Sequence, residues 1–162
     1  MRGVRDAVML NRVYLAACLV GIVAVSAQAA APPVPSNIMP ITRLVPAKPV
    51  PDQCVLHYRI TTSSPECQAF FDQGLGYYYS YVWMEAARSF ETAIRHDPTC
   101  PMAWWGLSRA LQGWGKNTQT KALLEAWRLK DNASPREQML IKARMQEKGQ
   151  LPGVGDGEQR VK

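Results

Sequence analysis

One stretch of the sequence decides the fold: residues 67–114, which read CQAFFDQGLGYYYSYVWMEAARSFETAIRHDPTCPMAWWGLSRALQGW. Small and aromatic residues recur in it at helical spacing, because residues three or four positions apart share a helix face. They form two series, Phe70, Gly74 and Tyr77, and then Ala86, Phe90 and Ala93. Pro98 ends the second series, since proline lacks an amide hydrogen and clashes with the preceding turn. The stretch therefore predicts an antiparallel pair of helices.

This pattern resembles the tetratricopeptide repeat (TPR), a 34-residue helix–turn–helix unit with aromatic, Leu, Gly and Tyr positions, then Ala and Phe, and a closing Pro. Seven positions match in register: Phe70, Gly74, Tyr77, Ala86, Phe90, Ala93 and Pro98. Gln73 replaces the usual Leu. A second copy starts 34 residues later, with Trp104, Leu107 and Leu111, and with Ser108 at the small-residue position. The sequence of this stretch also resembles that of bacterial exported repeat proteins. This resemblance implies an all-α solenoid.

The chain divides into four expected parts. They are a signal peptide (1–29), a Pro-rich linker with an extended segment (30–64), a TPR-like helical domain (65–148) and a Gly-rich tail (149–162). In the helical domain the repeats cover about 67–100 and 101–134, and a further helix covers 135–148. Ser64 and Ser134 each precede a Pro, which is a helix-start signal. Glu137 stands three residues after Ser134, as in a capping box.

The first 29 residues have the pattern of a secretory signal. Three Arg precede an apolar run of 13 residues, 13–25, and Ala27 and Ala29 form a small–x–small cleavage site. A cleaved signal would place the protein in the periplasm or outside the cell. Two alternatives remain open: an uncleaved membrane anchor, and lipidation at Cys18, because residues 15–18 resemble a lipoprotein box.

The segment between the signal and the helices has no helical period. Residues 30–53 contain seven Pro, which predicts either a semi-rigid spacer or a simple connector. Residues 55–60 alternate, and we expect them to pack as an extended segment on the first helix. The formal net charge of +6 falls when the signal, with three Arg and one Asp, is removed. This mild excess does not favour nucleic-acid binding.

No catalytic or cofactor motif appears among the Cys, His and carboxylate residues, so we predict no enzyme, no cofactor and no metal site. Cys54, Cys67 and Cys100 remain after loss of the signal. Cys67 and Cys100 occupy nearly equivalent places in successive repeats, whose first helices pack about 8–10 Å apart, beyond the reach of a disulfide. The candidate disulfide therefore joins Cys54 and Cys67, and three unpaired thiols are the alternative.

The resemblance also implies a binding groove on the other face of each first helix. In register, the groove residues are Phe71, Leu75, Tyr78, Trp105, Arg109 and Gln112. An aromatic platform beside Arg109 would suit an extended peptide or a C-terminal carboxylate. The alternative is that neighbouring segments, including residues 54–60, cover this face.

We therefore expect a non-catalytic TPR scaffold that binds a protein or peptide in the cell envelope, with the membrane involved only through an uncleaved signal. Two alternatives are an accessory N-terminal module of a larger exported enzyme, for example a redox enzyme, and a structural envelope spacer. Repeat arrays need about three units to bury their apolar faces. Because two hairpins and one unpaired helix are recognisable, we expect the chain to be a fragment of a longer array.

Overall fold

A computed structural model describes residues 37–51 and 56–151, and this described part is all-helical, without a strand. The expected all-α class is confirmed. The helices are α1 (Pro65–Tyr79), α2 (Trp83–His96), α3 (Pro101–Gly113), α4 (Gln119–Arg128) and α5 (Pro135–Glu147), and a short 3-10 turn, η1 (Lys130–Asn132), follows α4. The predicted signal, Cys18, Cys54 and most of the Gly-rich tail lie outside the described residues.

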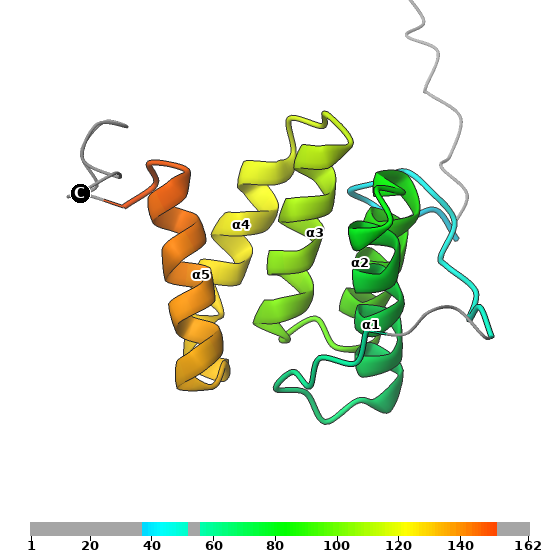
Figure 1. Ribbon diagram of the computed structural model, residues 1–162, viewed down its shortest axis with the longest axis horizontal. Helices are drawn as coiled ribbons and strands as arrows, with labels where there is room; N and C mark the ends of the chain where they lie inside the picture. Colours follow the sequence, from blue (N-terminus) through cyan, green and yellow to red (C-terminus); the bar gives the residue numbers. More distant parts are fainter. Residues whose placement is uncertain (1–36, 52–55, 152–162) are drawn as a thin grey trace, which may run out of the picture. The chain divides into compact units, whose positions relative to one another are not determined.

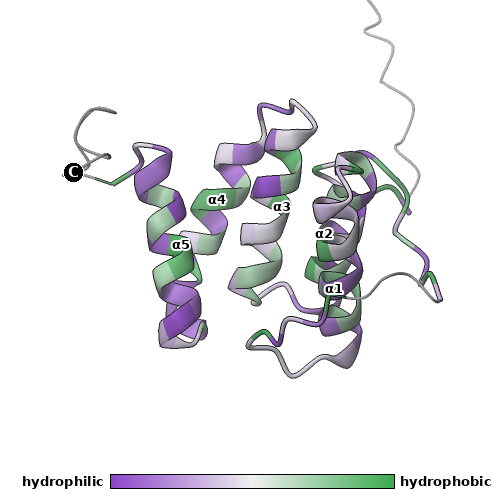
Figure 2. Ribbon diagram, in the orientation of Figure 1, coloured by the Kyte–Doolittle hydropathy of each residue, from purple (hydrophilic) through white to green (hydrophobic). Residues whose placement is uncertain are grey.

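The helices follow one another in chain order across the view of Figure 1. Each α-helix contacts the next one in the chain, and this includes α4 and α5, although η1 lies between them in the sequence. In addition, α1 contacts α3 and α3 contacts α5, so the odd-numbered helices form a continuous row. Each helix carries both hydrophobic and hydrophilic residues (Figure 2), as expected for helices that bury one face.

The local helix-start signals act as predicted. The Ser64 side chain accepts a hydrogen bond from the amide of Cys67, and Pro65 is the first residue of α1. The predicted capping box of Ser134 and Glu137 is present at the start of α5. These bonds satisfy amide groups that have no partner inside the helix.

Phe90 of α2 lies at the centre of the core and is 1% exposed. A Cβ atom added to Gly74 of α1 would lie 2.7 Å from the Phe90 ring, and one added to Gly106 of α3 would lie 2.6 Å from it. Both distances are too short for non-bonded carbon atoms, so only glycine lets α1 and α3 approach this ring. Sequence reasoning placed Ser108 at the small position of α3. Ser108 is also buried, but Gly106 is the residue that meets Phe90.

The other positions of the repeat pattern differ in burial. Most are buried: Phe70, Ala86, Ala93, Leu107 and Leu111. Tyr77 and Trp104 are half-buried, and Pro98 is exposed. The Trp104 indole N–H donates to the carbonyl oxygen of Pro98 at 3.0 Å, so these two positions are linked to each other.

Residues 37–51 are bound to the helices, which corrects the expectation of a mere spacer or connector. The amides of Ile41 and Thr42 each donate to one carboxylate oxygen of Glu91 on α2, both at 2.7 Å. Met39 is buried. The amide of Ala47 donates to the hydroxyl of Thr92, and the amide of Val50 donates to the side-chain carbonyl of Gln73. Within the segment, the amide of Met39 donates to the carbonyl oxygen of Leu44 and that of Arg43 to the carbonyl oxygen of Met39. The amides that these internal bonds leave unpaired find acceptors on the helices.

Residues 56–60 lie along α1, as the alternating pattern predicts. The amide of Tyr58 donates to Asp72 at 3.1 Å, and that of Ile60 donates to Gln68 at 3.0 Å. Gln68 in turn donates to the carbonyl oxygen of Tyr58 at 2.9 Å. The segment therefore uses α1 side chains as partners for its backbone.

The glycine contact with Phe90 can be tested with two leucine substitutions on the same helix. Gly74→Leu should lower the free energy of unfolding by about 3 kcal/mol, because the new side chain overlaps the Phe90 ring. Ala69→Leu adds a leucine on the exposed side of α1 and should change it by no more than about 0.5 kcal/mol. Urea denaturation followed by circular dichroism measures both. Equal stability of the two variants would contradict the packing.

Docking of residues 37–51 can be tested by proteolysis. Glu91→Gln weakens two charge-assisted hydrogen bonds, so trypsin should cleave the bond after Arg43 at least about tenfold faster. Glu85→Gln is the matched control, because Glu85 lies on the same helix and pairs with Arg88. If both variants are cleaved at the wild-type rate, Glu91 does not hold the segment.

Candidate functional site

A cavity of about 620 Å³ lies among the odd-numbered helices and residues 56–58. Three of the six predicted groove residues line it: Phe71, Leu75 and Trp105. The other lining residues are Leu56, His57, Tyr58, Tyr79, Met102, Arg136 and Leu140. Its wall is therefore mainly apolar and aromatic, which is typical of sites that take an apolar group.

Arg136 is the one cation of this wall, and the described lining residues include no carboxylate. Its guanidinium lies 5.1 Å from the centre of the Tyr58 ring, so it is held at the cavity edge by a cation–π contact. Sequence reasoning missed Arg136 and Met102. The signal was available, because the two residues are 34 positions apart, which is one repeat length.

Arg109 lies beside the cavity but does not line it. Its guanidinium donates to the hydroxyl of Tyr78 at 3.1 and 3.2 Å and stacks 5.1 Å from the centre of the Trp105 ring. Arg109 and Tyr78 therefore form a supporting cluster behind Trp105. Gln112, also predicted for the groove, accepts a hydrogen bond from Arg144 instead. Half of the predicted groove residues therefore line the cavity, and the other half bond to residues outside its wall.

The Trp105 side chain carries a donor that is not used within the described part of the chain. Its indole N–H is shielded from solvent and has no hydrogen-bond acceptor among the described residues. An indole N–H usually finds a partner when it is buried. Because this nitrogen is shielded, a ligand oxygen would reach it only if the neighbouring side chains moved.

The alternative that residues 54–60 cover the groove holds in part, because residues 56–58 form one wall of the cavity. This segment is tied down at two points. Asp72 of α1 accepts from the amide of Tyr58 and lies 2.7 Å from Nδ1 of His57. Glu137 of α5 accepts from the amide and hydroxyl of Thr61, at 2.8 and 2.5 Å. The segment therefore bridges α1 and α5 and leaves the cavity between them.

Glu137 has a larger role than the predicted cap. Besides Thr61, its carboxylate accepts from the amide and the hydroxyl of Ser134, both at 2.7 Å. Burial opposes ionisation of Glu137, but the hydrogen bonds from Thr61 and Ser134 outweigh it and hold its pKa below the usual value. A more polar hollow of about 730 Å³, also bordered by Arg136, adjoins this carboxylate.

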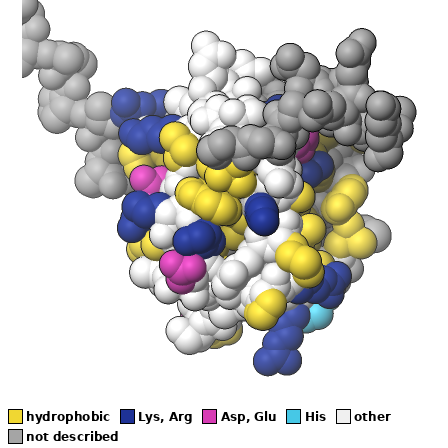
Figure 3. Space-filling view, turned by 90° about the vertical axis from the view of Figure 1, so that its left-hand side faces the viewer, with side chains coloured by type: hydrophobic (Ala, Val, Ile, Leu, Met, Phe, Trp, Pro, Cys, Tyr) yellow, Lys and Arg dark blue, Asp and Glu magenta, His cyan; other side chains and the backbone are white. Residues whose placement is uncertain are grey.

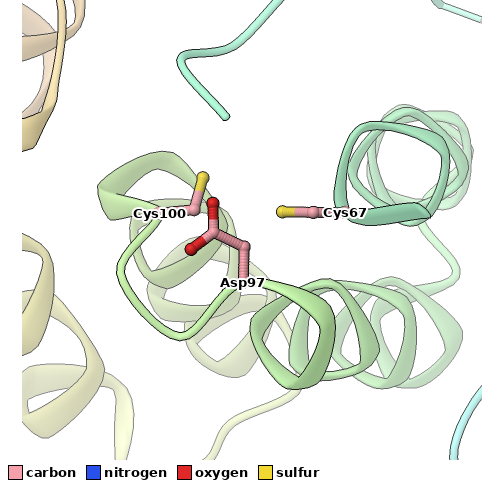
Figure 4. A group of neighbouring side chains, drawn as sticks. All are labelled: Cys67, Asp97 and Cys100. Carbon is pink, nitrogen blue, oxygen red and sulfur yellow. The ribbon is translucent and has the colours of Figure 1, made fainter. Parts of the chain in front are cut away.

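A second cluster, which sequence reasoning did not predict, contains Cys67, Asp97 and Cys100 (Figure 4). The two sulfur atoms and a carboxylate oxygen all lie within 4.8 Å of one another. Cys67 is in the first turn of α1, whereas Cys100 precedes α3 as its N-cap residue. The sequence argument used the distance between helix axes and did not foresee that the two sulfur atoms meet, although both thiols are free in the structure. Their side chains project into the space between the helix starts.

The cysteine pair is shielded from solvent, with Cys67 0% and Cys100 1% exposed. The hydrogen bond with Cys67 and burial raise the pKa of Cys100, whereas the hydrogen bond with Cys100 lowers the pKa of Cys67. One thiol of the pair thus ionises before the other. The predicted partner of Cys67, Cys54, lies outside the described residues, and that pairing stays a prediction.

The cluster offers three possible metal ligands, one fewer than a structural zinc site uses. Zinc takes four ligands in such sites, and only these three groups gather here among the described residues. The Asp97 carboxylate is also engaged, because it accepts from the hydroxyl of Thr62 at 2.6 Å and from the amide and hydroxyl of Thr99 at 3.0 and 2.7 Å. These bonds outweigh the effect of burial and lower the pKa of Asp97.

Comparison with known proteins gives no match: no protein-family model, no curated protein and no solved structure matches the chain.

The Glu137 bridge should make stability depend on pH. Because the pKa of Glu137 is lowered in the folded state, its stabilisation is present above the unfolded pKa, about 4.3, and is lost as the pH falls through the folded value. Glu137→Gln should therefore be less stable than the wild type by about 2 kcal/mol at pH 7, with the gap shrinking towards pH 3. Thermal melts measured across this range provide the test.

The control for this experiment is Asp131→Asn, because the Asp131 side chain is 81% exposed. Its stability gap from the wild type should stay small at every pH. A gap for Glu137→Gln that is independent of pH would show that the carboxylate charge does not hold the bridge.

Proposed function

We propose that this chain is a non-catalytic TPR-type scaffold that binds an extended peptide of a partner protein in the cavity among α1, α3 and α5. The paired contacts of α1 with α2 and of α3 with α4, and the row of odd-numbered helices, support a solenoid in which α5 begins a further hairpin. The matching register positions and the glycine packing around Phe90 support the same assignment. In a TPR array the first helix of each hairpin lines the binding groove.

The lining of the cavity supports a particular class of peptide. An apolar wall with Trp105 and Leu75 suits a large apolar side chain. Arg136 at the edge, without a lining carboxylate among the described residues, favours an acidic group next to that side chain. The face on the α5 side shows hydrophobic side chains together with Lys and Arg, and fewer Asp and Glu (Figure 3), which agrees with an acidic partner.

The cellular setting of this function is part of the proposal. The signal pattern in residues 1–29 supports export to the cell envelope. Within the described residues, no helix is long and apolar enough to cross a membrane. The single observation that carries the proposed function is the apolar cavity with one cation at its edge.

Peptide selection followed by charge reversal tests this function. Peptides selected from a random phage-displayed library on the full chain should share a large apolar residue beside Asp or Glu. Calorimetry with a selected peptide should show affinity weakened about tenfold or more by Trp105→Ala, because the apolar contact is lost, and by Arg136→Glu, because the charge is reversed.

Lys142→Glu is the matched charge control, since Lys142 is exposed on α5 and does not line the cavity. It should change the affinity less than about twofold. Equal weakening by Arg136→Glu and Lys142→Glu, or full binding by Trp105→Ala, would place the binding site elsewhere.

A further inference from the structure

We propose that Cys67 and Cys100 form a redox pair that closes into a disulfide and fastens the start of α1 to the start of α3. The two sulfur atoms lie within 4.8 Å of each other and are directed towards a common space (Figure 4). No disulfide joins them in the structure, so they are described in their reduced state. This inference is independent of the proposed peptide binding.

The remaining distance can be closed by small movements. A disulfide bond is about 2.05 Å long, so the sulfur atoms must approach by less than about 3 Å. A change between staggered rotamers at one cysteine moves its sulfur by up to about 3 Å. Cys100 has extended backbone geometry before α3, with φ −76° and ψ 108°, so its side chain is not confined by a preceding helical turn.

The position of the pair also favours thiol chemistry. Cys67 lies in the first turn of α1, where the helix dipole and free amides stabilise a thiolate. The nearby Asp97 carboxylate and burial oppose ionisation, but the hydrogen bond with Cys100 outweighs them and lowers the pKa of Cys67. The thiolate is the form that attacks a disulfide. Cys100 lies next to it as the second thiol, which can complete the exchange.

The oxidant is a small-molecule disulfide, such as oxidised glutathione. The Cys67 thiolate attacks one of its sulfur atoms, forms a mixed disulfide and releases one thiolate. Cys100 loses its proton and attacks the Cys67 sulfur, which forms the bond between Cys67 and Cys100 and releases the second thiolate. The two cysteines lose two electrons and two protons, and the small disulfide is reduced to two thiols.

Access to the pair depends on the segment before α1. Both sulfur atoms are shielded, and Thr62 of this segment donates to Asp97 beside them. Thr61, its neighbour, is bound to Glu137. Oxidation therefore requires this segment to open, so it should be slow in the wild type and faster in Thr62→Val, which lacks the hydroxyl donor.

A cross-link agrees better with the cluster than a bound metal ion does. A zinc ion would need a fourth ligand, and both oxygens of Asp97 already accept hydrogen bonds from Thr62 and Thr99. A disulfide needs only the two sulfur atoms. It would also leave the hydrogen bonds of Asp97 in place.

The test uses the full chain, incubated with oxidised glutathione and then alkylated in denaturant, digested with trypsin and analysed by mass spectrometry. We expect a disulfide-linked pair of peptides, 60–88 and 96–109, which contain Cys67 and Cys100. A link between peptide 60–88 and the peptide that contains Cys54 would overturn the proposal in favour of the pairing expected from sequence. Free thiols at both positions after prolonged oxidation would also overturn it.

Thermal melting supplies a second readout. The oxidised protein should melt about 10 °C or more above the reduced protein, because the cross-link encloses all of α2 and restricts the unfolded chain. Cys100→Ser should abolish this shift, whereas Cys54→Ser should retain it.

A metal titration tests whether the cysteine cluster binds a metal ion instead of forming a disulfide. The reduced chain is titrated with Cd²⁺, which absorbs in the ultraviolet when thiolates bind it. Stoichiometric binding that Cys67→Ser abolishes, together with resistance of both thiols to oxidation, would show a metal site and overturn the redox proposal. Absence of this absorption, with the linked peptides present, supports the disulfide.

Discussion

The contact of Phe90 with two glycines is the constraint on which the rest of the structure depends. Gly74 and Gly106 let α1 and α3 both approach the Cδ1–Cε1 edge of one ring, which is itself 1% exposed. Any larger residue at either position would separate the two helices. Their spacing in turn sets the distance across the cavity, from Leu75 on α1 to Trp105 on α3. It also brings the starts of the same two helices, with their cysteines, together.

Buried carboxylates organise the parts of the chain that are not helical. Glu91 binds the amides of residues 41 and 42, Asp72 binds the amide of Tyr58, and Glu137 binds Thr61. A buried segment without secondary structure must find acceptors for its amides, and a carboxylate can accept several at once. Through these contacts, residues that precede α1 become part of the site: one stretch bounds the cavity, and Thr62 shields the cysteine pair.

Sequence reasoning was most successful where the signal is local. The helices, their starts at Ser64 and Ser134 and the extended segment on α1 follow from spacing and capping chemistry within a few residues. It was less successful for contacts between distant residues. Three of the six predicted groove residues line the cavity, whereas Arg109 is held by Tyr78, and the cation of the cavity edge is Arg136. A periodic pattern predicts which helix face a residue occupies, but it does not predict which side chain of a neighbouring element contacts that residue.

By itself, the sequence determined that the chain forms successive amphipathic helices and where most of them begin, because periodicity and capping act over less than two helical turns. Only the tertiary structure decided that residues 37–51 are docked and that Cys67 meets Cys100. Both depend on side-chain direction and on partners tens of residues away, here Glu91 for the docked segment. The physical reason is that helix axes set distances of about 8–10 Å, whereas side chains that project between helix ends can meet well inside that distance.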